Sequence, residues 1–119
     1  MRIDFRKIKW FFQKCKRGYS DRDLWNLDNW ILDMLEKVIN DFKIQNNHSY
    51  PSKFDSMEEW TNELEYVHSL LKQINEANEK GWSWENDTFS SYEEYYNYLN
   101  ETKDKIFDWL KKYLFDLWD

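Results

Sequence analysis

Residues that interrupt helices are rare in this sequence, and their rarity limits the possible fold more than any other feature. The 119 residues include two glycines and one proline, whereas an all-β chain needs a turn residue about every dozen positions. Long segments instead repeat apolar side chains at intervals of three and four residues, as the buried side of a helix requires. We therefore expect an all-α fold, with one compact four-helix domain over residues 1–119.

The N-terminal part of the chain predicts two helices. A short basic helix is expected over residues 4–15 and ends before Gly18, which favours a break. Ser20 is followed by acidic residues and can accept a hydrogen bond as the cap of the next helix. That second helix is expected over residues 21–42, with a continuous apolar stripe facing the core.

Two capping-box motifs predict the remaining helices. Ser56-Met-Glu-Glu59 opens an apolar pattern that indicates a third helix over residues 56–78. Ser91-Tyr-Glu-Glu94 opens a longer pattern, which indicates a last helix over residues 91–117.

Charge is distributed unevenly along the chain. Residues 1–17 contain seven Lys and Arg and one acid, a net charge of +6, while residues 18–119 contain ten against twenty-two acids, a net charge of −12. An acidic body favours basic protein surfaces and repels nucleic acid and anionic membranes. We therefore expect no membrane binding and no direct nucleic-acid binding. The rings of the first helix have a spacing that suits burial, so this helix is expected to pack on its own body or to meet an anionic partner.

The single cysteine indicates where the protein works. Cys15 has no partner for an internal disulfide, fits a reducing compartment, and is expected to be a small core residue. No apolar run approaches the roughly 18 residues of a membrane span, and charges interrupt the region that a signal peptide would need. These features favour a cytoplasmic protein.

Two aspartates lie on the predicted apolar side of the second helix. At about 100° per residue, Asp28 points close to the direction of Leu24, and Asp21 lies seven residues before Asp28 on the same side. A buried carboxylate must be hydrogen-bonded or paired. Asp21 and Asp28 are therefore expected to form a buried polar network, and a ligand pocket at this place stays open as an alternative.

One stretch of the sequence resembles a known group of proteins. The run Arg17-Gly-Tyr-Ser-Asp-Arg-Asp-Leu-Trp-Asn-Leu-Asp28, with Tyr50-Pro51 and Glu58-Glu59-Trp60 downstream, is similar to small, largely uncharacterised proteins of bacteriophages and mobile elements. The likeness covers about residues 17–75. It implies a phage-type origin in a bacterial host cell, and it carries over no catalytic residue. Small phage proteins that bind host proteins include antagonists of host defence, such as anti-CRISPR proteins.

Acidic pairs leave an enzymatic alternative open. The spacing in Glu76-Ala-Asn-Glu79 and Glu101-Thr-Lys-Asp104 is similar to that of all-helical, magnesium-dependent nucleotide pyrophosphohydrolases. The four carboxylates would have to converge on one ion, and their positions along the predicted helices do not favour this. The sequence contains no His or Cys spacing typical of zinc. We therefore expect no catalytic residue, metal or cofactor.

The wealth of aromatic residues favours a binding role. Trp, Tyr and Phe make up 20% of the chain, more than a core of this size needs, and such rings are enriched at interfaces. We expect a non-enzymatic protein that blocks a basic surface of a host protein, such as a nucleic-acid-binding immune effector. Self-association in a structural or regulatory role is a further alternative. The expected partner contacts are Trp82, Trp84, Glu85, Asp87, Glu93 and Glu94.

Overall fold

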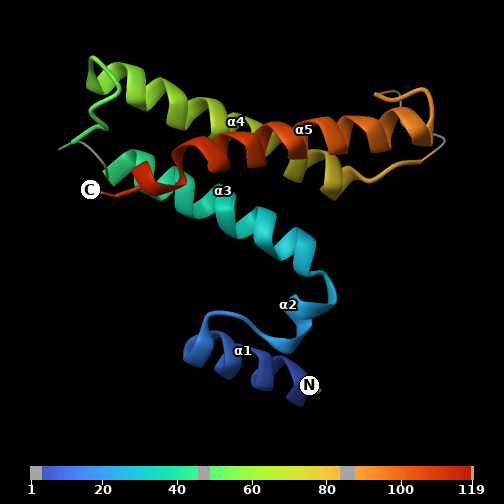
Figure 1. Cartoon of the computed structure of the whole chain (residues 1–119). Helices are drawn as coiled ribbons and strands as arrows, with labels where there is room; N and C mark the ends of the chain where they lie inside the picture. Colours follow the sequence, from blue (N-terminus) through green and yellow to red (C-terminus); the bar gives the residue numbers. More distant parts are fainter. Residues whose placement is uncertain (1–3, 46–48, 84–87, 119) are drawn as a thin grey trace. The chain divides into compact units, whose positions relative to one another are not determined.

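The described elements of the chain are all helical. The computed structural model describes residues 4–45, 49–83 and 88–118, and each element assigned within these ranges is a helix. The all-α prediction is confirmed, whereas the predicted number of four helices is wrong, because five α-helices and a short 3-10 helix are assigned within these ranges. In chain order the elements are α1 (Phe5–Arg17), α2 (Asp21–Trp25), α3 (Leu27–Gln45), α4 (Met57–Lys80), α5 (Tyr92–Tyr113) and the short 3-10 helix η1 (Leu114–Asp116), as Figure 1 shows.

The chain consists of two compact units, Met1–Ile31 and Leu32–Asp119, and their boundary falls within α3. The first unit contains α1, α2 and the start of α3. The second contains the rest of α3, together with α4, α5 and η1. The expectation of one domain over residues 1–119 stays a prediction.

The helix predicted over residues 21–42 is interrupted at Asn26. This residue leaves helical geometry, with φ −129° and ψ 55°, so α2 ends at Trp25 and α3 begins at Leu27. The Asn26 carbonyl accepts the first backbone hydrogen bond of α3, from Trp30 N–H at 3.0 Å. Short polar side chains such as asparagine compete with the helical backbone for hydrogen bonds, which makes them common at helix boundaries. The predicted continuous apolar stripe is therefore wrong at this point.

The predicted starts of α4 and α5 are confirmed in atomic detail. Ser56 Oγ accepts a hydrogen bond from Glu59 N–H at 3.2 Å, and Ser91 Oγ accepts one from Glu94 N–H at 3.1 Å. In a standard capping box, the acid accepts a hydrogen bond from the backbone N–H of the capping serine. Here each acid accepts from the residue before that serine: Glu59 from Asp55 N–H at 2.9 Å, and Glu94 from Ser90 N–H at 3.0 Å. These bonds satisfy backbone donors that a helix start leaves without intrahelical partners.

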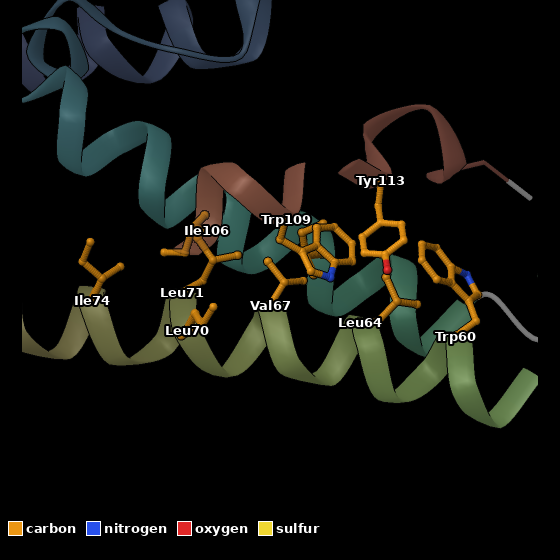
Figure 2. Packing of buried hydrophobic residues seen from close by; sticks show 10 residues of the cluster. Trp60, Leu64, Val67, Leu70, Leu71, Ile74, Ile106, Trp109 and Tyr113 are labelled. Carbon is orange, nitrogen blue, oxygen red and sulfur yellow. The ribbon is translucent and has the colours of Figure 1, made fainter. Parts of the chain in front are cut away.

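The core of the second unit lies between α4, α5 and one side of α3. Helices α4 and α5 run antiparallel and side by side (Figure 1). Their apolar residues meet along this contact (Figure 2). The Trp60 and Trp109 rings stack with centroids 6.0 Å apart. The fully or nearly buried apolar residues are Ile39 of α3, Trp60, Leu64, Val67, Leu70, Leu71 and Ile74 of α4, and Tyr95, Ile106, Trp109 and Tyr113 of α5.

A polar bond crosses this core and offers a test of the packing. The Trp109 indole N–H donates to the Glu63 carboxylate at 3.0 Å, and Trp109 is 4% exposed. We expect Glu63→Ala to lower the free energy of unfolding by about 1.5 kcal/mol, because a buried donor loses its charged acceptor. Glu63→Gln keeps an acceptor and should cost less. Urea unfolding followed by circular dichroism measures both changes, and an equal loss for the two variants would contradict the assigned bond.

Candidate binding surface

The structure describes half of the predicted contact residues, namely Trp82, Glu93 and Glu94. Trp84, Glu85 and Asp87 fall outside the described residues. Trp82 follows Gly81, which ends α4 with a φ of 65° that favours glycine. Glu93 and Glu94 belong to the first turn of α5.

Trp82 belongs to a row of aromatic rings on the second unit. Its half-buried side chain packs edge-on against Tyr92, with ring centroids 5.7 Å apart. Tyr92 stacks in turn on Tyr96 with centroids 6.2 Å apart, and both tyrosines are more than half exposed. The rings of the row thus pack against one another and still leave much of their surface accessible, as aromatic residues at an interface do.

Glu94 has a structural task at the start of α5, and its contact role stays a prediction. Its carboxylate accepts hydrogen bonds from the Ser90 hydroxyl and from Ser90 N–H, the latter at 3.0 Å. These bonds lower the pKa of Glu94 below its ordinary value. A carboxylate engaged in this way closes the start of α5, so it is a poorer candidate for a partner contact than its neighbour Glu93.

An open recess lies along the acidic side of α5. It has a volume of about 500 Å³ and is lined by Phe89, Ser91, Glu93, Glu94, Asn97, Tyr98 and Glu101. Glu93 and Glu101 are exposed. The centroids of the Phe89 and Tyr98 rings lie 5.2 Å apart. The same two residues also line a second recess, of about 240 Å³, toward the end of α4.

The placement of these groups favours a cationic ligand group. At about 100° per residue, Glu93, Asn97 and Glu101 form a strip along α5, with Tyr96 beside one edge and Tyr98 beside the other. Carboxylates attract a Lys or Arg head group, and aromatic faces bind it through cation–π contact. We call this surface, made of Phe89, Tyr92, Glu93, Tyr96, Asn97, Tyr98 and Glu101, the α5 surface.

The sequence-based choice of contacts missed most of this surface. Phe89, Tyr96 and Tyr98 were not among the predicted residues, and Glu101 entered only through the magnesium alternative. The spacing of Tyr92, Tyr96 and Glu93 in the Tyr-Glu-Glu-Tyr-Tyr run held the available signal, because residues three and four apart share a helix face.

The carboxylates of the magnesium alternative do not gather. Among the residues that the structure describes, no three His, Cys, Asp or Glu side chains lie close enough to hold a metal ion together. Glu76 lines the recess at the end of α4, whereas Glu101 lines the recess along α5. A hard cation requires several oxygen ligands at one point, and this geometry does not offer them.

Asp21 is the polar centre of the first unit. Its carboxylate accepts hydrogen bonds from Gln13 at 2.9 Å and from Arg17 at 2.7 Å, and it lies 3.4 Å from Lys9 Nζ. Asp21 N–H donates back to the Gln13 side-chain oxygen at 2.8 Å. The Gln13 hydrogen bond, followed by those of Arg17 and Lys9, lowers the pKa of Asp21 to about 2. These contacts attach α1 to the start of α2.

Asp28 does not join this network. Its side chain is exposed, as is that of Leu24, the apolar neighbour from which its direction was predicted. The break at Asn26 removes the continuous helix on which the expected buried pair of Asp21 and Asp28 depended. The polar network instead joins Asp21 to α1.

The pKa of Asp21 predicts how the first unit responds to acid. Because it is lowered from 3.8 to about 2, the ionised carboxylate stabilises the unit above about pH 4. This stabilisation is lost as the pH falls from about 4 toward 2. Carboxyl-carbon NMR shifts should give a midpoint near 2 for Asp21, and Gln13→Ala should raise it while Gln73→Ala on α4 does not. A wild-type midpoint near 4 would contradict the network.

The chain has no match among the known proteins with which it was compared. No protein-family model matches the chain, and the searches of curated proteins and of solved structures find no match. Within the described ranges, no helix has both the length and the apolar character needed to cross a bilayer.

Proposed function

We propose that this chain is a small binding protein that captures Lys or Arg side chains of a partner protein on the α5 surface. The observation that carries the proposal is the open recess in which exposed Glu93 and Glu101 lie beside the Phe89 and Tyr98 rings. Acid and ring act on the same cation, because the carboxylate supplies charge and the ring face supplies a desolvated contact. The role is binding, not catalysis.

The wider charge distribution supports the same kind of partner. Residues 32–119 contain nine Lys and Arg against nineteen acids, a net charge of −10. Such a field speeds the approach of a basic protein and disfavours nucleic acid. A nucleic-acid-binding protein holds phosphates with Lys and Arg side chains. The α5 surface would bind these same side chains and so compete with the nucleic acid for them. Antagonism of a host-defence protein, as the phage resemblance implies, is our specific form of this proposal.

A peptide titration tests the proposed recognition directly. An arginine-rich peptide is added to the isotope-labelled full chain, and a glutamate-rich peptide of equal length is the control. We expect the arginine-rich peptide to move the backbone NMR signals of Glu93, Asn97 and Glu101 and the control to leave them unchanged. Binding should weaken as salt is raised, because exposed charges are screened. Signal changes confined to other helices, or none at all, would contradict the proposal.

Mass and melting measurements distinguish the alternatives. Self-association predicts a mass above 15.0 kDa in light scattering, and a nucleotide role predicts that magnesium and a nucleotide together raise the melting temperature. Our proposal predicts a monomer whose melting temperature nucleotides leave unchanged.

A further inference from the structure

Within the described part of the first unit, no other segment buries the apolar side of α1. No residue of α1 is buried, and Phe5, Phe11 and Phe12 are 76%, 62% and 64% exposed. Cys15, expected in the core, is exposed as well. An amphipathic helix ordinarily turns its apolar side toward the core. The contacts of the polar side of α1 explain why this helix differs.

The polar side of α1 makes the contacts within the first unit. Gln13 and Arg17 bind Asp21, and Lys14 Nζ lies 3.8 Å from the Asp23 carboxylate. Trp10, the ring on this side, packs edge-on against Trp25 with centroids 5.6 Å apart. The helix is therefore attached through its polar side, and this attachment directs the apolar side away from α2.

The exposed side of α1 has a regular arrangement. At about 100° per residue, its apolar residues fall within an arc of roughly 120°. Lys7 and Lys14 border one edge of the arc, and Lys9 and Lys16 border the other. Lys9 and Lys14 also lie within ion-pair distance of Asp21 and Asp23. The helix contains six Lys and Arg and no acid. We call this arc the α1 apolar face; it consists of Phe5, Ile8, Phe11, Phe12 and Cys15.

We propose that the α1 apolar face docks on an anionic lipid surface. A helix that lies in the membrane interface has phenylalanine and other apolar residues on one side and lysines at the borders, whose long stems let the ammonium groups reach the phosphates. This proposal departs from the sequence-based expectation of no membrane binding, which followed from the repulsion between an acidic body and anionic membranes. It concerns binding at the surface of a bilayer.

Two other occupants fit the α1 apolar face less well. Pairing with the same face of a second copy would bring together two helices that carry only positive side-chain charge. Nucleic acid would bind the bordering lysines through its phosphates and stack bases on single rings. A continuous arc of apolar side chains is buried more completely in the apolar interior of a lipid surface. The net charge of −10 on residues 32–119 opposes an anionic surface, so the proposal depends on the apolar contact as well as on the lysines.

Vesicle flotation of the full-length protein tests this proposal. We expect binding to phosphatidylcholine vesicles that contain about a third phosphatidylserine, and little binding to phosphatidylcholine alone. Phe12→Glu should lower the partition coefficient at least about tenfold, because it places a charge in the apolar arc. Phe115→Glu is the matched control, since Phe115 is a 91% exposed phenylalanine of the second unit, and it should change partitioning less than about twofold.

Two further measurements make the result decisive. Unchanged circular dichroism of Phe12→Glu shows that any lost binding does not come from unfolding. A polarity-sensitive dye on Cys15, the only cysteine of the chain, should shift to the blue with the anionic vesicles. No binding to these vesicles, equal binding to both vesicle types, equal loss for the two variants, or binding without a dye shift would each overturn the proposal. A dimer that Phe12→Glu dissociates, without vesicle binding, would assign the face to a second copy.

Discussion

Replacing Trp60 by alanine is expected to lower the free energy of unfolding by about 4 kcal/mol, the largest stability effect that we predict. Trp60 has 0% exposure, and its ring contacts those of Phe54, Trp109 and Tyr113 at centroid distances of 5.3 to 6.0 Å. Alanine removes the apolar area and leaves a cavity that the surrounding rings cannot fill without moving. The loss is large beside the roughly 5–15 kcal/mol that stabilises an ordinary domain.

Urea unfolding followed by circular dichroism measures this loss, and Trp118→Ala is the matched control. Trp118 lies near the chain end with 68% of its surface exposed, so its replacement should change the free energy of unfolding by less than about 0.5 kcal/mol. The same residue types are exchanged at both positions, so the difference between them reports burial. Equal losses would show that the aromatic cluster around Trp60 is not packed as described.

The helix starts were predictable because they depend on local chemistry. Ser20, Ser56 and Ser91 each cap the helix that follows, as their motifs indicate. The long-range packing was harder to predict. Trp109 is 4% exposed, and its ring stacks on that of Trp60, forty-nine residues away. Sequence spacing alone does not identify such a partner.

The break at Asn26 shows how one local error spreads through a prediction. A single helix over residues 21–42 placed Leu24, Leu27 and Asp28 on its core side, and all three are exposed. The side of α3 that packs on the second-unit core is formed by Leu32, Leu35, Ile39 and Phe42, and the last three of these belong to the predicted stripe. Periodicity gives the direction of a side chain only while the helix is continuous.

The α5 surface was predictable in character but not in its members. Excess rings and negative charge indicated an accessible acidic surface, and Glu93 belongs to it. Sequence could not reveal that Glu94 is engaged by Ser90, nor that Phe89 of the preceding loop meets Tyr98 on the helix. Both facts depend on how the loop returns to α5. A partner-binding surface built from a loop and a helix therefore needs coordinates before its residues can be chosen.

The geometry of α5 leads to the largest expected effect on binding. Glu93→Lys combined with Glu101→Lys should lower the affinity for the arginine-rich peptide at least about tenfold, because like charges placed opposite each other cost several kcal/mol. Glu94 is left unchanged because its carboxylate accepts hydrogen bonds from Ser90 at the start of α5. Isothermal titration calorimetry measures the affinity, and circular dichroism checks that helix content is kept.

The matched control is Glu58→Lys combined with Glu65→Lys on α4, where both glutamates are exposed. Each double variant changes the net charge from −6 to −2. Glu58 and Glu93 also occupy the same position, the second residue of their helices, so the loss of favourable interaction with the helix dipole is matched. We expect the control to weaken binding less than about threefold, through the long-range field alone. Equal weakening by both variants would mean that net charge, and not the α5 surface, attracts the peptide.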